Sequence, residues 1–370
     1  MKVRLGDLTR IKTGKLDANA SSPDGVYPFF TCSKEPLRID SYSYDCECVL
    51  VAGNGDLNVK YYHGKFDAYQ RTYIIESNGN GKLFMPYLYY FMDGYLDKLR
   101  KMSIGGVIKY IKLGNLTDAL IELPDYETQK QVVRVLNKVE EVITARQQEL
   151  QKLDNLIKAR FVEMFGIYPA NQMGWETGKI RDTVADVRYG SSRPAVDGGK
   201  YPYLRMNNIT YGGELDLSDV KRIDVPENEL DKCTVRRGDV LFNRTNSKEL
   251  VGKTCVYDRD EMMVLAGFVI RVRVNDRVLP EFLSAFLNTD FSKKTLSEMC
   301  KAAIGQANIN AQEMQNIGLY LPPLELQRQF VQFKKQIDKS KVVESIHRMN
   351  VLFNITLNGG NRYDIRANEF

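Results

Sequence analysis

The chain has 370 residues, more than one ordinary hydrophobic core can organise, so its length predicts two globular units with connecting elements. A hydrophobic fraction of 43% and a charged fraction of 27% are typical of a folded soluble protein. The N-terminus lacks the apolar core of a signal peptide, and no run approaches the roughly 18 apolar residues that span a bilayer, so we expect a cytoplasmic protein.

The net charge of +5 is spread thinly along the chain. Over residues 1–125, 126–165, 166–324 and 325–370, Lys and Arg exceed Asp and Glu by 1, 1, 0 and 3. This balance excludes a uniformly basic surface. If the chain binds duplex DNA, either its cations cluster locally or a partner supplies many of the phosphate contacts.

The cysteines predict neither a disulfide framework nor a metal site. Only Cys46 and Cys48 lie close together, and the two histidines, His63 and His347, are far apart in sequence. A zinc site would need a second pair of ligands near the first. We therefore expect six scattered, reduced thiols and no bound metal.

Residues 1–124 are predicted to form the first globular unit. The runs "VYPFFT" and "ECVLVAG" are short and apolar, as in buried strands, and "PYLYYFM" predicts a helix that begins behind a proline. The phrase "LPDYETQKQVV" then predicts the start of a long helix, because Pro124 stands outside it while Asp125 and Glu127 place negative charge at its N-terminus.

Residues 125–166 are predicted to be that long helix, which ends at Gly166. Its apolar residues recur with alternating steps of four and three, the spacing of a coiled-coil seam. At 1.5 Å per residue, about 38 helical residues make a rod of about 55 Å. The seam consists of Val132, Leu136, Val139, Ile143, Leu150, Leu153 and Ile157.

The remainder of the chain repeats this order. "VYPFFT" has a counterpart in "KYPYLR", "ECVLVAG" in "GDVLFNR", "PYLYYFM" in "PEFLSAFL", and "SIGGVIKYIKLGNL" in "AIGQANINAQEMQNI". The helix phrase returns as "LPPLELQRQFV", with Pro322 and Gln327 each 198 positions after Pro124 and Gln129. A series of matches in one order predicts a duplicated domain.

The second copy occupies residues 167–322 and leads into a second long helix, residues 323–358, with a tail of residues 359–370. Because a globular unit separates the two helices, we predict that they pair as an antiparallel coiled coil; packing of each helix on its own domain, or dimerisation, stays open. We predict the fold class α/β (α+β), with two tandem pseudo-repeated globular domains that are each followed by a long helix. The second seam is Phe330, Phe333, Ile337, Val342, Ile346, Met349 and Phe353.

Catalytic motifs are missing. "SKELVGKT" resembles a phosphate-binding loop, but Ser247 replaces its first glycine, and neither histidine has the context of a nucleophilic triad. We expect no enzymatic activity and no cofactor in this chain.

Polar, aromatic and basic residues gather instead in loops at matching places of both copies. Arginine and asparagine read bases well, and lysine meets phosphate. Loops are polar in any protein, so a solvated surface explains each residue taken alone. The predicted DNA-binding residues are Lys12, Lys15, Lys34, Asn54, Lys60, Tyr61, Tyr62, Arg71, Arg188, Tyr189, Ser191, Arg193, Arg205, Asn207, Asn208, Arg244, Asn246, Lys248 and Lys253.

The doubled helix phrase, "DVLFNRTNSKELVGK" and "IGQANI" together resemble the specificity subunit of Type I restriction-modification systems over nearly the whole chain. The resemblance implies double-stranded DNA as a ligand, with each globular unit reading one half of a bipartite, asymmetric site. It also implies that the helices set the gap and dock two methyltransferase subunits, which restriction and translocase subunits join. S-adenosylmethionine, Mg²⁺ and ATP would belong to those partners.

Two other interpretations stay open. The chain could be a coiled-coil scaffold that binds proteins without reading DNA, or the specificity subunit of a phage-defence system that only methylates.

Overall fold

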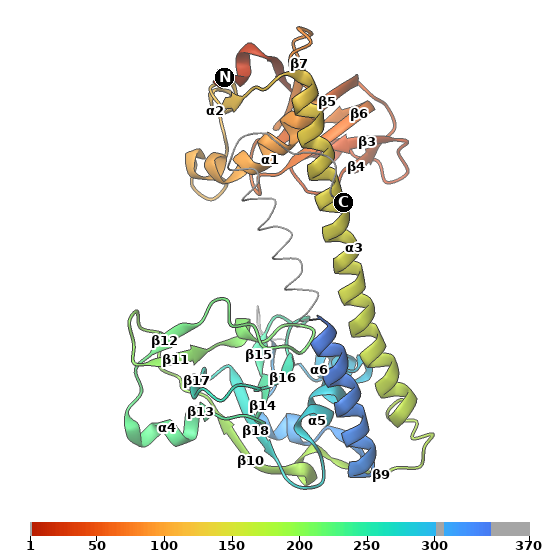
Figure 1. Cartoon of the computed structure of the whole chain (residues 1–370), viewed down its shortest axis with the longest axis vertical. Helices are drawn as coiled ribbons and strands as arrows, with labels where there is room; N and C mark the ends of the chain where they lie inside the picture. The colour runs from red at the N-terminus through yellow and green to blue at the C-terminus, as the bar shows by residue number, and fades with distance from the viewer. Residues whose placement is uncertain (1, 301–306, 342–370) are drawn as a thin grey trace. The chain divides into compact units, whose positions relative to one another are not determined.

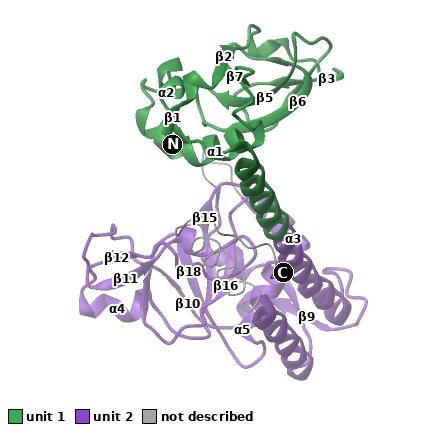
Figure 2. Cartoon of the chain, turned by 45° about the horizontal axis from the view of Figure 1, so that its top comes forward, with its two compact units in different colours: residues 1–144 green, residues 145–370 purple. Residues whose placement is uncertain are grey.

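The computed structural model describes residues 2–300 and 307–341, and the contacts within the chain divide it into unit 1, residues 1–144, and unit 2, residues 145–370 (Figure 2). The elements up to the long helix are β1 (Lys2–Arg4), β2 (Thr9–Thr13), β3 (Tyr27–Phe30), β4 (Leu37–Ile39), β5 (Tyr44–Ala52), β6 (Val59–Ala68), β7 (Thr72–Ser77), α1 (Met85–Met102), α2 (Leu113–Thr117), β8 (Leu120–Glu122) and α3 (Tyr126–Phe165).

Unit 1 is built on a six-stranded sheet in the order β2-β7-β5-β6-β3-β4 (Figure 1). Side chains on β5 alternate between its two faces, as the period of a strand requires. Val49 and Val51 pack with Leu88 of α1, whereas Leu50 packs with Phe66 on the opposite face. Both faces of the central strand are therefore buried, which explains why "CVLVA" is a continuous apolar run.

Unit 2 divides the same plan into two four-stranded sheets, β10-β18-β14-β16 and β12-β11-β17-β13. Val240 and Phe242 of β14 pack on helix α5, and Leu241 faces the other core. The remaining elements are β9 (Glu176–Lys179), β10 (Val184–Tyr189), β11 (Tyr201–Leu204), β12 (Lys221–Ile223), α4 (Glu227–Cys233), β13 (Thr234–Val235), β14 (Val240–Asn243), β15 (Thr245–Asn246), β16 (Thr254–Val256), β17 (Met263–Leu265), β18 (Val269–Val274), α5 (Pro280–Leu287), α6 (Asp290–Met299), β19 (Ala307–Asn308), α7 (Ala311–Gln315) and β20 (Gly318–Leu321).

The pairing of strands in the two units confirms the duplication predicted from the sequence. Tyr27 stands opposite Ile39 in the β3–β4 pair, and Tyr201 stands opposite Ile223 in the β11–β12 pair. In each unit the first of these strands also pairs in parallel with a third, β6 or β17. The long strand β6 of unit 1 is replaced in unit 2 by two shorter strands, β16 and β17.

Two matched glycines allow the close approach of backbones that both copies need. A Cβ added to Gly14 would lie 2.1 Å from the carbonyl oxygen of Ala68, and one added to Gly190 would lie 2.3 Å from that of Ala266. Neither distance is compatible with a side chain, so glycine is the residue that fits at both places.

Helix α3 is continuous over 40 residues, which corresponds to about 60 Å. Asp125 caps its N-terminus by accepting hydrogen bonds from the backbone N–H and the hydroxyl of Thr128. Its C-terminus is followed by Gly166 with φ of 81°, the left-handed conformation expected of a helix stop. The seven predicted seam residues of α3 are all half-buried.

The repeated helix phrase encodes a fully buried glutamine. The side-chain oxygen of Gln129 accepts from the backbone N–H of Phe84 at 2.8 Å, and its nitrogen donates to the carbonyl oxygens of Lys82 at 2.8 Å and Pro124 at 3.0 Å. One amide thus ties the residues before α1 to the first turn of α3. We call this arrangement the glutamine clamp.

Gln327 makes the equivalent clamp in unit 2. It accepts from the backbone N–H of Leu279 at 2.8 Å and donates to the carbonyl oxygens of Arg277 at 3.1 Å and Pro322 at 2.8 Å. Both glutamines are 0% exposed. Each clamp thus provides hydrogen-bond partners both for backbone groups of the loop before a domain helix and for a backbone carbonyl at the start of a long helix.

The second long helix is described over residues 324–341 and runs antiparallel to the C-terminal half of α3. Phe330 packs on Phe165 and Phe161, and the Arg160 guanidinium lies over the ring of Phe333. Further along, Lys341 pairs with Asp154 and with Glu214, the latter at 2.9 Å. Pairing of the two long helices as a coiled coil stays a prediction, and Val342, Ile346, Met349, Phe353 and the tail 359–370 lie outside the described residues.

We predict that Gln129→Ala lowers the free energy of unfolding by about 2 to 4 kcal/mol, because three partly buried hydrogen bonds to the backbone are lost. Gln148→Ala, on the exposed side of the same helix, is the matched control and should stay within about 0.5 kcal/mol of the wild type. Urea titration followed by circular dichroism measures both. Equal effects of the two substitutions would contradict the clamp.

Candidate nucleic-acid interface

Four loops of unit 1 gather at one end of the sheet, residues 14–16, 31–35, 53–60 and 69–72. Backbone hydrogen bonds connect them: Gln70 N–H donates to Leu16 at 2.9 Å, and Gly53 N–H donates to Arg71 at 2.8 Å. The Asn58 side chain donates to the carbonyl oxygen of Cys32 at 2.8 Å. We call these residues the unit 1 loop cluster. It brings together five of the predicted residues, namely Lys15, Lys34, Asn54, Lys60 and Arg71.

The cations of this cluster differ in their availability. Lys15, Lys34 and Arg71 are exposed, and within residues 2–300 and 307–341 they form no ion pair. Lys60 is half-buried, its burial lowers its pKa, and it donates to the side-chain oxygen of Asn58. Three exposed, unpaired cations are therefore available to bind an anion.

The other predicted residues of unit 1 lie along the sheet. Lys12 on β2 pairs with Glu76; burial opposes its charge, but Glu76 outweighs this and raises its pKa. The Tyr61 hydroxyl donates to Glu47 at 2.8 Å, and Tyr62 packs edge-on against Phe66. These three predicted residues already have structural partners.

A short hairpin, residues 104–110, extends the unit 1 loop cluster. It joins the cluster through Gly55 N–H, which donates to Lys109 at 3.0 Å, and through Ile111 N–H, which donates to Gly53 at 2.9 Å. In the sequence "SIGGVIKYI" is recognisable as part of the repeat, but the exposed apolar tip that it forms, Val107 and Ile108, was not predicted. The signal was available: two apolar residues directly after two glycines.

Unit 2 has an equivalent cluster, formed by residues 190–193, 205–208, 243–248 and 266–268. Arg244 N–H donates to Phe268 at 2.9 Å, and Ile309 N–H donates to Arg244 at 2.9 Å, as Gly53 and Ile111 do in unit 1. The Arg244 guanidinium lies 5.0 Å from the centroid of the Tyr189 ring. Phe268 is half exposed at the tip and was not predicted.

Several predicted arginines of unit 2 carry a counter-charge. Arg188 pairs with Asp186 at 3.0 Å, Arg193 with Glu229 at 2.8 Å, and Arg205 with Asp219 at 2.7 Å. All three pairs are at least partly exposed, so their net contribution to stability is small and an anion can compete for the arginine. Asp186 is two residues from Arg188, whereas Asp219 and Glu229 lie 14 and 36 residues from their arginines, too far for a local sequence pattern to reveal.

Burial divides the remaining predicted residues. Asn208 accepts from Arg205 N–H and donates to Asp216, Lys253 donates to Met206 at 2.8 Å, and Ser191 is 9% exposed, so these three support the loops from below. Asn246 is half-buried and accepts from Ser247 N–H at 2.9 Å. The exposed residues are Asn207 and Lys248, and Lys248 has no ion pair in the described part of the chain.

The "SKELVGKT" segment is a turn between strands rather than a phosphate loop. Gly252 N–H donates to Asn243 at 2.8 Å, and Asn243 N–H donates to Lys253 at 2.8 Å, so these backbone groups are used within the fold. The Lys253 ammonium points inward to Met206. These backbone groups and this ammonium are therefore not presented to a bound phosphate.

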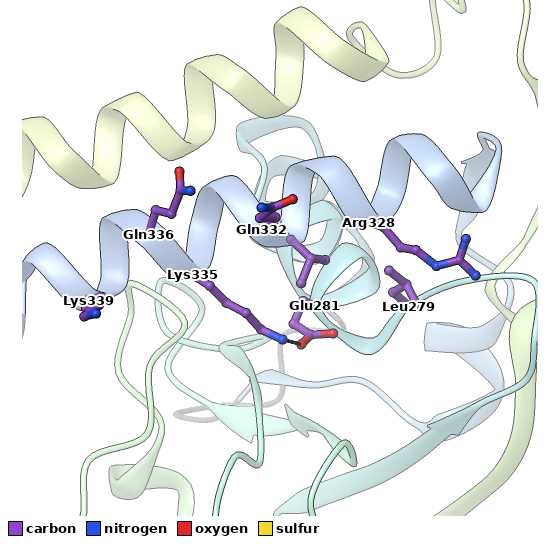
Figure 3. A pocket seen from close by; sticks show the side chains of 8 residues that line it. Leu279, Glu281, Arg328, Gln332, Lys335, Gln336 and Lys339 are labelled. Carbon is purple, nitrogen blue, oxygen red and sulfur yellow. Dashed lines mark ion pairs between the residues drawn. The ribbon is translucent and has the colours of Figure 1, made fainter.

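A groove of about 670 Å³ lies between the start of α5 and the helix 324–341 (Figure 3). Arg328, Lys335 and Lys339 line it, and Lys335 pairs with Glu281 at 3.4 Å. Its lining contains no cysteine, serine or histidine that could act as a nucleophile or base.

Within the residues that the structure describes, no three or more His, Cys, Asp or Glu side chains are grouped so that they could hold a metal ion. The helices of this part of the chain are also not long and apolar enough to span a membrane.

Comparison with protein families finds a match to the Type I restriction modification DNA specificity domain over residues 1–155 and 173–349. The EcoDI specificity subunit of Escherichia coli is 38% identical over 156 residues, which are 42% of this chain and 34% of that protein. The EcoKI specificity subunit of Escherichia coli strain K12 is 22% identical over 66% of this chain and 56% of its own length. The matches thus span between a third and about half of these two relatives.

Other similarities extend over nearly the whole chain. The MjaVIII specificity subunit of Methanocaldococcus jannaschii is 24% identical over 96% of this chain and 92% of its own. The crystal structure of the S subunit of a Type I restriction-modification system from M. genitalium superposes with a TM-score of 0.51 at 15% identity, covering 95% and 94% of the two chains. At this identity the likeness concerns the fold.

Proposed function

Because the chain belongs to the family of Type I restriction-modification specificity subunits, we propose that it reads a bipartite, asymmetric DNA site, with each unit reading one half. The observation that carries this proposal is the pair of equivalent loop clusters, one on each copy of the duplicated unit. Two copies that share a fold but differ in their loop residues are suited to two different half-sites.

The clusters supply the kinds of contact that DNA reading needs. Lys15, Lys34, Arg71 and Lys248 are exposed and unpaired in the described residues, which suits them to phosphates. Arg244, held over an aromatic ring, and the exposed Asn207 have the donors that bind guanine and adenine edges. Asn208, Lys253 and Ser191 would support these loops from below. Arg188, Arg193 and Arg205 would contact DNA only when their ion pairs open.

The long helices would set the distance between the half-sites. A continuous helix is stiff, so its length, rather than the flexibility of a linker, would determine the gap. The clamps support this role, because each anchors the first turn of a long helix to its recognition domain.

Catalysis belongs to other subunits in this family, and this chain is the non-catalytic member. We propose that two methyltransferase subunits dock on the helices and that restriction and translocase subunits join the complex. The methyl donor, Mg²⁺ and ATP would then be bound by those partners. Methylation alone and restriction differ only in which partners are present.

Co-expression with a methyltransferase subunit from the same genome tests the function directly. Long-read sequencing of the host DNA should reveal methylated adenines in one bipartite motif with a gap of constant length. An unchanged methylation pattern, despite a complex that purifies intact, would refute DNA reading and leave the scaffold interpretation.

The phosphate contacts can be tested residue by residue. Arg71→Ala and Lys248→Ala should each lower the slope of log K against log salt by about 1 and weaken binding to cognate and unrelated duplexes alike. Lys179→Ala, an exposed lysine on β9 outside both clusters, is the control and should leave the slope unchanged. Fluorescence anisotropy of the complex at several salt concentrations measures all three.

The role of the helices predicts a change of gap without a change of half-sites. Seven residues, two helical turns, would be inserted after Arg146, with a matching insertion in the second helix so that the pairing is kept. We expect the methylated motif to keep both half-sites and to acquire a longer gap. New half-site sequences with the old gap would contradict this role.

A further inference from the structure

The 104–110 hairpin is held rigidly for so short a segment. Its ends are joined by two hydrogen bonds, Ile104 N–H to Tyr110 at 3.0 Å and Tyr110 N–H to Ile104 at 2.9 Å. Gly105 has φ of 119°, and a Cβ there would lie 2.6 Å from the carbonyl oxygen of Ile108, so the bend depends on glycine. Two further backbone bonds, described above, brace the hairpin on the unit 1 loop cluster.

The tip of this braced hairpin is apolar and faces outward. Val107 is 103% exposed and Ile108 is 63% exposed. Apolar side chains gain free energy when they leave water, and a rigid tip loses little conformational entropy on doing so. The hairpin therefore has an exposed, braced apolar tip that is suited to insertion into the apolar interior of a binding partner.

The charge around the tip selects the kind of partner. Residues 98–115 contain five basic residues and no acidic one. Among them Lys101, Lys109 and Lys112 are exposed and form no ion pair within the described residues. An apolar tip with basic residues on both sides of it in the sequence matches a polyanion with an apolar interior. A DNA duplex, with phosphates outside and stacked bases inside, has this composition.

We propose that Val107 and Ile108 insert as a wedge between two adjacent base pairs of the DNA bound by unit 1. The proposal rests on the proposed function and adds a deformation of the DNA to it. Wedges of this kind unstack one base step and bend the duplex, and they favour steps that unstack easily. The lysines beside the tip would contact the phosphates of the opened step.

The wedge would contribute to specificity without a hydrogen bond to any base. Pyrimidine–purine steps are the most easily unstacked, so the half-site read by unit 1 would contain or adjoin one. The cluster residue Asn54 would then read bases next to this step, since it pairs with Tyr110 at the base of the hairpin.

The test uses the complex of the full chain with its methyltransferase subunit and a duplex that carries the motif found by methylation mapping. 2-Aminopurine replaces single bases in and beside the half-site of unit 1, except at the methylated adenine, where extrusion by the partner would also raise the fluorescence. We expect the 2-aminopurine fluorescence to rise at one base step when the complex binds the duplex. The double substitution Val107→Ser with Ile108→Ser should abolish this rise and weaken binding about tenfold.

Two variants serve as controls. Val26→Ser removes a valine that is 71% exposed at the other end of strand β3 and should keep both the rise and the affinity. Val107→Ile keeps an apolar tip and should keep the rise. Melting temperatures of all variants should equal that of the wild type, because each change is at an exposed side chain.

The other outcomes overturn the wedge. A double variant that keeps the rise, or a wild-type complex that binds its motif without a rise at any step, would refute insertion while leaving the proposed function intact. Loss of the methyltransferase subunit from the double variant on gel filtration would show that the tip binds protein instead. A wild-type complex without sequence-specific binding would refute the proposed function itself.

Discussion

The glutamine clamp is the interaction on which the rest of the structure depends. A fully buried amide must satisfy both its oxygen and its nitrogen, and Gln129 does so with one backbone donor and two backbone acceptors from two segments. Such a group tolerates only one geometry, because a shift of either segment leaves a buried polar atom without a partner. The direction in which a long helix leaves its domain is thus coupled to the start of the domain's own helix.

The clamp at Gln327 extends this coupling into an aromatic cluster. Phe161 and Phe165 at the end of α3 pack against Phe282 of α5 and Phe330 of the helix 324–341. The core of unit 2 therefore includes the end of one long helix and the beginning of the other. In a protein that would measure the distance between two half-sites, a stiff helix is useful only if its ends are held this firmly.

Duplication separates the constant part of the fold from the variable part. The close approaches at Gly14 and Gly190 and the two clamps are the same in both units. The loops above them differ: unit 1 offers unpaired lysines and an apolar hairpin, whereas unit 2 offers arginines balanced by carboxylates. A shared frame with different loops suits the proposed reading of two unlike half-sites, and it leaves exposed cations at local positions of a nearly neutral chain.

The sequence by itself determined the duplication, the apolar strands, and the start and stop of α3 at Asp125 and Gly166, because these depend on local patterns and on repetition. Only the tertiary structure decided what Gln129 and Gln327 do, since their partners are up to 50 residues away. It also separated exposed from buried cations: Lys248 and Lys253 are five positions apart and look alike in sequence, yet one faces solvent and the other a carbonyl oxygen inside the unit. Val107 is likewise apolar, as core residues are, yet it is fully exposed because the backbone pairing of its hairpin places it at the tip. Burial and ion pairing depend on contacts between distant segments, and no local periodicity encodes them.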